Sequence, residues 1–366
     1  MRTTLFETHQ TPADLLPDLL ALPAGGSVLV LGGADSGKTT WARGAAQALA
    51  HAGRLVAVVD CDLGQSEIGP PATVGVALAA PHSEWSALRD LPPLAAYFVG
   101  STSPARHALD VCVGAIQMVR VAKKRRPDLV LIDTDGLVGG SNARTFKRRL
   151  AELLLPQVIV ALARGPELDP LLTAFRGMDA PDVWRVPVAA EVGRKTTAAR
   201  ATRRAARFLS ALDDSRSVTV SLDDVALLGT WLGTGAPLAH HLLHFLGQSL
   251  ERPVLHAERL PGGGLYVVVN GERWNTGGLA AVESHFATRS VSVVAAQKFA
   301  RLLVGLVSPS NALLGLGLIE RIDFARRTLT ILTPCRKPGA VAQVWLGGLK
   351  LEPDGCEVGE VRPGEV

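Results

Sequence analysis

The sequence predicts an α/β fold, in which a parallel sheet with helices on both faces is followed by a smaller, mostly β C-terminal domain. Apolar strand-like runs alternate with helical stretches from Gly25 to about Leu212, and this alternation is typical of a parallel sheet. After residue 213, short β-like runs are separated by Gly, Pro and Asn, which indicates a β-rich domain. A length of 366 residues also suits two domains better than one.

We expect an N-terminal arm over residues 1–24, a first domain over 25–212 and a second over 213–366. The composition, with 47% hydrophobic and 20% charged residues, is that of a soluble globular protein. The N-terminus lacks an apolar signal core and no run approaches the roughly 18 apolar residues of a membrane span, so we expect no membrane association. Four widely spaced cysteines form no C-x-x-C pair, which favours a cytoplasmic location over a disulfide or zinc framework.

The first strand of the sheet is expected at Val28–Leu31, and the residues that follow it have the pattern of a phosphate-binding loop. Residues 32–39 fit G-x-x-x-x-G-K-[ST], in which backbone N–H groups and the next helix wrap phosphate oxygens. A helix-prone stretch, Trp41–Ala52, follows as the motif requires. Lys38 supplies a mobile charge for the β- and γ-phosphates, and Thr39 offers its hydroxyl to Mg²⁺. The expected nucleotide-binding residues are Gly33, Ala34, Asp35, Ser36, Gly37, Lys38, Thr39 and Thr40.

The second strand, Leu55–Val59, is followed by two carboxylates, Asp60 and Asp62, and then by Gln65. Carboxylates at positions i and i+2 of a strand end point to the same side, here toward the bound nucleotide. One of them can hold Mg²⁺ through water while the other accepts a proton from an attacking hydroxyl. Gln65 can orient a phosphate oxygen or a metal-bound water.

Polar residues also follow the next two strands, which we expect at Tyr97–Val99 and Leu129–Ile132. Ser101 and Thr102 lie in a Gly-Ser-Thr-Ser-Pro segment that suits a loop gripping a phosphate or a substrate. The fourth strand ends in Asp133, which is the general form of a Walker B element and a further candidate for coordinating Mg²⁺ water. Asp135 lies two residues further on and is a candidate for substrate binding.

The remaining strands of the first domain are expected at Val158–Leu162 and Val183–Val188. Those of the second domain are expected at Val218–Leu222, Gly264–Val269, Ser290–Val294, Leu316–Ile322 and Thr328–Leu332. We expect the tail from Pro353 to be loose. Ligands of open α/β sheets bind beyond the carboxyl ends of the strands, so the polar residues of the first domain should converge at one edge.

The chain is mildly basic, with a net charge of +4, but its cations gather in three clusters. The first, at 120–126, is explained as a solvated face. The second, at 144–149, contains Arg148, which we expect to bind substrate through its charge. The third, at 194–207, lies in an Ala-rich helical stretch with almost no balancing acids. It fits a lid that supplies guanidinium groups to a transferring phosphoryl group.

Together these segments resemble the polynucleotide 5′-hydroxyl kinase family, which includes the kinase subunit of eukaryotic pre-mRNA cleavage factor, a ribosomal-RNA-processing kinase and archaeal RNA kinases. The resemblance covers about residues 25–352. It is carried by residues 32–39, 60–65, 98–104, 132–138 and the Arg-rich 194–207, and in the C-terminal part by residues 302–306, 314–317, 322–324 and 332–334. It implies an enzyme of RNA processing or repair that uses ATP and Mg²⁺ to phosphorylate the 5′-hydroxyl end of RNA, or of DNA.

By position, the resemblance implies that Asp62 is the general base, that Thr102 belongs to a clasp on the substrate end, and that Arg194 and Arg200 are lid arginines. Leu137 stands where family members often carry a Trp that stacks on the first base. The expected catalytic residues are Lys38, Asp62, Arg194 and Arg200. The expected substrate-binding residues are Gln65, Ser101, Thr102, Asp135 and Arg148, and the expected metal-site residues are Thr39, Asp60, Gln65 and Asp133.

Two other functions stay open at this point. An ATPase or GTPase switch of the metal-insertion or partitioning type also pairs a P-loop with an acidic second-strand end. Such switches often carry an additional loop Lys, which Ala34, Asp35 and Ser36 do not supply. The second alternative is a nucleic-acid-binding scaffold that holds ATP without turning it over.

Overall fold

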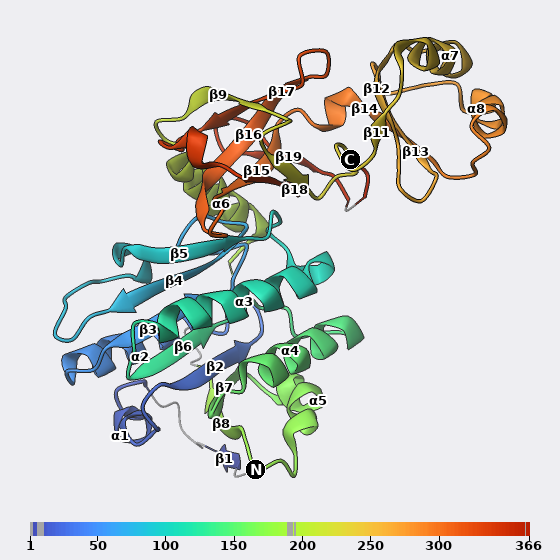
Figure 1. The fold of residues 1–366 in the computed structure, drawn as a ribbon. Helices are drawn as coiled ribbons and strands as arrows, with labels where there is room; N and C mark the ends of the chain where they lie inside the picture. The colour runs from blue at the N-terminus through green and yellow to red at the C-terminus, as the bar shows by residue number, and fades with distance from the viewer. Residues whose placement is uncertain (1–2, 6–10, 189–192, 194, 363) are drawn as a thin grey trace. The chain divides into compact units, whose positions relative to one another are not determined.

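The computed structural model describes residues 3–5, 11–188, 193, 195–362 and 364–366. The chain divides into two compact units, Met1–Arg207 and Phe208–Val366 (Figure 1). No helix among the described residues is both long enough and apolar enough to cross a membrane.

The first unit is built on an eight-stranded sheet with the order β1-β8-β7-β2-β6-β3-β4-β5. Its strands are β1 (Thr3–Leu5), β2 (Gly26–Gly32), β3 (Val56–Asp60), β4 (Thr73–Ala79), β5 (Pro93–Phe98), β6 (Leu129–Asp133), β7 (Val158–Ala163) and β8 (Asp182–Pro187). Neighbours are parallel from β1 to β3, whereas β4 pairs antiparallel with both β3 and β5. The expected α/β fold with a largely parallel sheet is confirmed.

The strand β4 is the main departure from the sequence-based expectation, which contains no strand at this place. Its residues are mostly small, and it follows a Gly-Pro-Pro turn, so the strand signal is weak. A Cβ added at Gly75 would lie 2.0 Å from the carbonyl oxygen of Ile68. Glycine is therefore needed here because the preceding loop packs directly onto the strand.

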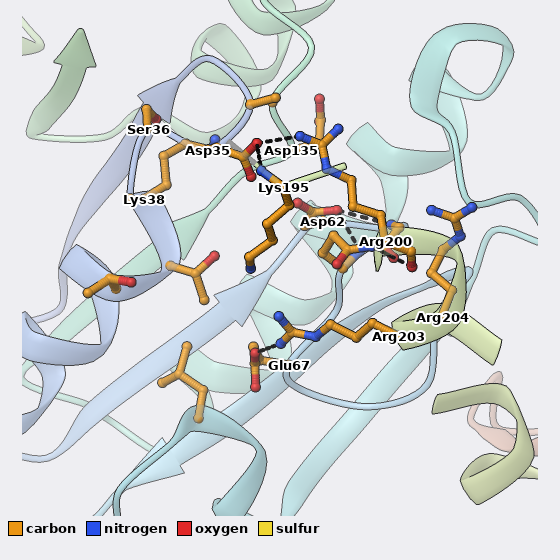
Figure 2. A pocket seen from close by; sticks show the side chains of 18 of the residues that line it. Asp35, Ser36, Lys38, Asp62, Glu67, Asp135, Lys195, Arg200, Arg203 and Arg204 are labelled. Atoms are coloured by element: carbon orange, nitrogen blue, oxygen red, sulfur yellow. Dashed lines mark hydrogen bonds and ion pairs between the residues drawn. The ribbon is translucent and has the colours of Figure 1, made fainter. Parts of the chain in front are cut away.

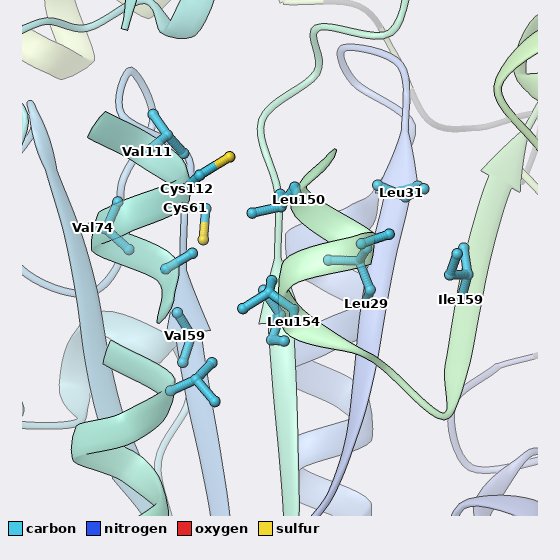
Figure 3. Packing of buried hydrophobic residues seen from close by; sticks show 14 of the residues in the cluster. Leu29, Leu31, Val59, Cys61, Val74, Val111, Cys112, Leu150, Leu154 and Ile159 are labelled. Carbon is cyan, nitrogen blue, oxygen red and sulfur yellow. The ribbon is translucent and has the colours of Figure 1, made fainter. Parts of the chain in front are cut away.

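Helices cover both faces of this sheet because successive side chains of its central strands point in opposite directions. Leu29 and Leu31 of β2 belong to the core on one face, and Val28 and Val30 to the core on the other. The first core is closed by α3 (Ala108–Lys123), α4 (Ser141–Leu154) and α5 (Asp169–Leu172), and the second by α1 (Leu16–Leu20) and α2 (Lys38–His51). Figure 3 shows α3 and α4 side chains packed on the first face.

The N-terminal segment packs on this unit through two elements. The strand β1 pairs in parallel with β8 at the edge of the sheet. Leu15 and Leu19 are buried, at 1% and 2% exposed, in the core beneath α2. After β8 the chain reaches α6 (Thr197–Ala211), the Arg-rich helix.

The second unit is mostly β, as the sequence predicts. One sheet contains β9 (Arg216–Ser221), β10 (Ala226–Leu228), β15 (Leu302–Val307), β16 (Leu313–Asp323), β17 (Thr328–Thr333), β18 (Gln343–Leu351) and β19 (Glu357–Glu360). The other contains β11 (Ala236–Pro237), β12 (Val254–Arg259), β13 (Leu265–Val269) and β14 (Val291–Ala295), against which α7 (His240–Leu250) and α8 (Leu279–His285) pack. The expectation of a loose tail is wrong, because β19 pairs with β18 and the terminal Val366 is buried in the core.

Candidate active site

The loop between β2 and α2 has the conformation of a phosphate-binding loop. Gly37 precedes the helix with a φ of 84°, which favours glycine. A Cβ at Gly32 would lie 2.3 Å from the hydroxyl of Ser36. The Lys38 side chain folds back over the loop, and its Nζ donates a 2.8 Å hydrogen bond to the carbonyl of Gly33. Backbone N–H groups and the N-terminus of α2 therefore surround a space that suits a phosphate group.

This loop forms one wall of a cavity of about 540 Å³. The other walls come from the segments that follow β3, β5 and β6 and from α6, so the expected convergence at the carboxyl edge of the sheet is confirmed. Figure 2 shows Lys38, Asp62 and Arg200 around the cavity. Lys38 is only 6% exposed. Burial lowers the pKa of its ammonium group, while the charges of Asp133 and Asp62 oppose this change.

Thr39 and Asp133 lie together beneath the loop, where their side chains fit a metal ion. The hydroxyl of Thr39 donates a 2.6 Å hydrogen bond to Oδ2 of Asp133. The other carboxylate oxygen, Oδ1, is buried and has no hydrogen-bond partner among the described residues. Burial raises the pKa of Asp133 to about 6, although Lys38 and Thr39 pull it down. A hydroxyl beside an unsatisfied carboxylate oxygen is a donor set for a hard cation such as Mg²⁺.

The two carboxylates after β3 have different surroundings. Asp62 lines the cavity, and its Oδ1 accepts hydrogen bonds from the backbone of Gly64 at 3.0 Å and of Gln65 at 2.9 Å. Its Oδ2 accepts none from the described residues. Burial raises the pKa of Asp62, and the charge of Asp135 adds to this shift. Asp62 thus presents one fixed, accessible oxygen to the cavity.

Asp60 does not line the cavity, and its expected role in holding Mg²⁺ through water stays a prediction. It is 1% exposed, and its oxygens accept hydrogen bonds from the backbone of Asp62, Glu67 and Ile68 and from the hydroxyl of Ser66. Burial and the neighbouring charges of Asp133 and Asp62 raise its pKa to about 7. Asp60 organises the loop that carries Asp62.

Gln65 and the segment after β5 form another part of the cavity wall. The Gln65 amide donates to the carbonyls of Gly64 at 2.8 Å and of Arg200 at 3.4 Å, which attaches the loop to α6. Thr102 lines the cavity together with Ser103 and Pro104. Ser101 is not among the lining residues, is 7% exposed, and forms hydrogen bonds within its own turn. Ser101 thus shapes its own turn, and its expected substrate contact stays a prediction.

Asp135 lines the cavity, but its carboxylate is already engaged. Its Oδ2 accepts a 2.6 Å ion-paired hydrogen bond from Lys147, and its Oδ1 accepts a 2.7 Å bond from the backbone of Leu137. Lys147 is fully buried. Through these contacts Asp135 fixes the loop after β6, and its expected substrate contact stays a prediction.

Lys147 has no predicted role of its own in the sequence, where it belongs to the basic cluster at 144–149. A signal was present: Lys147 falls on the same helical stripe as Ala143, Phe146 and Leu150, all of which are buried. A lysine on an apolar stripe requires a buried partner. Asp135, two residues beyond a Walker B aspartate, supplies it.

The helix α6 carries the arginines of the expected lid, three of which contact loops of the site. Arg200 forms an ion pair with Asp35 of the phosphate-binding loop. Arg203 forms one with Glu67, and Arg207 donates to the carbonyls of Glu67 at 3.2 Å and Gly69 at 2.7 Å. These contacts place the guanidinium groups of α6 over the cavity, which Arg200, Arg203 and Arg204 line.

Two expected site residues are not part of this arrangement. Arg194 lies outside the residues that the structure describes. Arg148 lies on α4 and does not line the cavity. Its guanidinium forms an ion pair with Glu152 one turn away, and both side chains are about one-third exposed. The expected substrate contact of Arg148 has no support in the cavity geometry.

Phosphoryl transfer requires a cradle for the phosphates, a group that accepts a proton, and cations that stabilise charge on the transferred group. One cavity of this protein is lined by a phosphate-binding loop, a carboxylate and several arginines, a combination that is typical of P-loop phosphotransferases. Residues 32–211 match the family model described as mRNA cleavage and polyadenylation factor CLP1 P-loop.

Relatives match nearly the whole chain. The polyribonucleotide 5′-hydroxyl-kinase of Thermococcus kodakarensis is 32% identical, over 98% of this chain and 98% of its own length. That of Pyrococcus furiosus is 31% identical, over 96% of each chain. The chain therefore belongs to the polyribonucleotide 5′-hydroxyl kinase family, and the resemblance inferred from the motifs is confirmed. Membership of a P-loop kinase family implies the use of ATP.

Two solved structures have the same fold. One is the wild-type Clp1p–Pcf11p complex, and the other is described as an extended interface between Pcf11p and Clp1p and the structural basis for ATP loss in a Gly135Arg point mutant. Their TM-scores are 0.59 and 0.61, they cover 92% and 93% of this chain and 77% and 80% of the matched chains, and the identities are 13% and 12%. At these identities the likeness concerns the fold alone.

Proposed function

We propose that this protein transfers the γ-phosphoryl group of ATP to the 5′-hydroxyl of RNA, or of DNA. The observation that carries the proposal is the position of Asp62, which lines the same cavity as Lys38 and Arg200. Its pKa is raised by burial, and a carboxylate with a raised pKa accepts a proton from a hydroxyl more readily than an ordinary aspartate does. The family to which the chain belongs supports the same activity.

The phosphate-binding loop supplies the nucleotide site. Its N–H groups surround the phosphates, and Lys38 exchanges its hydrogen bond to the carbonyl of Gly33 for phosphate oxygens. Lys38 lies too deep to be screened by water, so its charge acts on the phosphates at low effective dielectric.

The reaction is an in-line displacement. The 5′-oxygen of the RNA forms a bond to the γ-phosphorus as the bond to the β–γ bridging oxygen breaks, and ADP leaves. Oδ2 of Asp62 takes the hydroxyl proton. The guanidinium of Arg200 stabilises the negative charge that develops on the transferred group, because its paired N–H donors match the spacing of phosphoryl oxygens.

Thr39 and Asp133 would hold Mg²⁺, Asp133 through coordinated water, because their oxygens form the donor set described above. Such an ion would neutralise charge on the β- and γ-phosphates. Gln65 lies on the cavity wall, and its buried Oε1 has no hydrogen-bond partner among the described residues. It is therefore a candidate to orient a metal-bound water or a phosphate oxygen.

The substrate end of the polynucleotide is assigned to the wall formed by Thr102, Ser103 and Leu137. Leu137 offers an apolar surface of limited size, so stacking on the first base must come from another group, or the affinity must come from phosphate contacts. A cytoplasmic location and the absence of a membrane partner are part of the same proposal.

The proposed function is tested by incubating the protein with γ-labelled ATP and matched oligonucleotides that carry either a 5′-hydroxyl or a 5′-phosphate. We expect label on the 5′-hydroxyl RNA and none on the blocked oligonucleotide. Label released only as free phosphate would favour an ATPase switch. Bound ATP without either product would favour an ATP-holding scaffold, and either result would contradict the proposal.

A further inference from the structure

The fourth residue of the phosphate-binding loop is an aspartate whose side chain leaves the loop and contacts α6. Asp35 has a φ of 54°, and its Oδ2 accepts hydrogen bonds from the backbone N–H of Lys195 at 3.0 Å and from Nη2 of Arg200 at 2.5 Å. Figure 2 shows both contacts. The carbonyl oxygen of Asp35 accepts a further bond of 2.8 Å from Arg164, on the segment after β7. The residue is therefore the point at which three segments meet.

A carboxylate in a loop that binds phosphates is unfavourable by itself, because it repels the anion that the loop is built to hold. The contacts of Asp35 resolve this conflict. Its side chain is 12% exposed and lies against Arg200, which is 30% exposed. Burial raises the pKa of Asp35, but the Lys195 N–H and the Arg200 guanidinium outweigh this effect and lower it overall. The carboxylate stays ionised, and its charge is compensated by the lid.

The geometry of a guanidinium group allows Arg200 to serve two anions at once. The group is planar and has five N–H donors in a rigid fork. Nη2 is directed to Asp35, and this contact restrains the orientation of the fork. Arg200 also lines the cavity that contains Lys38, so donors beyond the one held by Asp35 are available to a phosphoryl group.

We infer that Asp35 is a positioning residue that docks the N-terminal part of α6 on the phosphate-binding loop and orients Arg200 toward the transferred phosphoryl group. The inference rests on the proposed function, because it assigns Arg200 to phosphoryl transfer. Further along α6, Arg203 and Arg207 are held by the loop that contains Glu67. Among the described residues, only Asp35 pairs with the guanidinium of Arg200.

The test is a double-variant cycle with Asp35→Gly and Arg200→Ala. Glycine removes the carboxylate and adopts the positive φ of this position without strain, so the loop conformation is kept. We expect Asp35→Gly to lower kcat at saturating ATP and RNA by about 10- to 100-fold, the size of a loss of alignment. In the Arg200→Ala background the same change should lower kcat less than about twofold, because the group that it positions is already gone. Asp35→Asn, which keeps shape and tolerates the same φ, should fall between wild type and Asp35→Gly.

The control uses Arg54 and Asp128, an exposed ion pair of the same unit at 3.2 Å. Asp35→Gly combined with Arg54→Ala should show additive effects. The inference would be overturned if Asp35→Gly lowered kcat by the same factor in the wild-type and Arg200→Ala backgrounds, or if Asp35→Gly raised kcat. Either result would leave the kinase activity in place.

A second readout does not depend on catalysis. Amide hydrogen exchange of residues 197–203 in the ligand-free full-length protein should accelerate in Asp35→Gly and in Arg200→Ala, with no further increase in the double variant. If the wild-type protein transfers no phosphoryl group, the proposed function fails and this measurement still decides the docking role. Unchanged exchange in Asp35→Gly would contradict that role.

Discussion

Replacing Lys147 with Met should destabilise the first unit more than any surface substitution in it. Lys147 is fully buried, and its Nζ lies 2.6 Å from Oδ2 of Asp135, whose side chain is 6% exposed. Met keeps most of the apolar stem of the side chain but removes the charge. Asp135 is then left as a buried carboxylate without its cation, and breaking a buried pair in this way typically costs about 3–5 kcal/mol.

The free energy of unfolding of this unit can be measured from hydrogen exchange of the β2 and β6 amides across a urea series. A companion variant combines Lys147→Met with Asp135→Asn and so removes the unpaired carboxylate charge. The amide oxygen of the new asparagine still accepts the hydrogen bond from the backbone of Leu137. We expect it to recover at least half of the loss. A Lys147→Met protein as stable as wild type, or a double variant no more stable than the single one, would refute the role of the buried pair.

Three further substitutions test the catalytic assignments. Lys38→Ala should abolish phosphoryl transfer without shifting the thermal unfolding midpoint, because the loop conformation depends on glycines and packing; near-normal label transfer would exclude this loop as the nucleotide site. Asp62→Asn should retain the Kd for ATP but lose about 10²- to 10⁴-fold in kcat, since the amide cannot accept the proton; an active Asp62→Asn beside an inactive Asp60→Asn would reverse the assignment. Arg200→Ala should lower kcat at saturating RNA by about 10³-fold or more, and Arg200→Lys should rescue it poorly because a point charge cannot replace a planar fork; a change confined to a salt-sensitive KM would make α6 an RNA-binding face.

The parts of the site that the sequence predicts well are those set by local backbone chemistry. The glycines of the phosphate-binding loop and the acids at the ends of β3 and β6 occur at fixed offsets from apolar runs. Such offsets translate directly into position on a parallel sheet. The loop, the cavity and the place of Asp62 follow from them.

The parts that the sequence predicts poorly depend on which partner a charged group meets in three dimensions. Asp60 and Asp62 are both aspartates at the same strand end, where the i, i+2 spacing predicts that they point to the same side. Asp60 is nevertheless buried under the following loop, whereas Asp62 lines the cavity. Arg148 belongs to a basic cluster, but a glutamate one turn away engages it. The contact between Asp35 and Arg200 joins residues 165 positions apart, and no local pattern encodes such a distance.

The most direct test of the account is the ratio of 5′-phosphorylated RNA to ADP formed in one reaction, with the RNA product measured by mass spectrometry and the ADP by chromatography. If the γ-phosphoryl group of ATP is transferred to the 5′-oxygen in the cavity lined by Lys38 and Asp62, RNA should gain one phosphoryl group for each ADP formed. Lys38→Ala should form neither product. ADP formed in excess while the RNA keeps its 5′-hydroxyl would contradict the account.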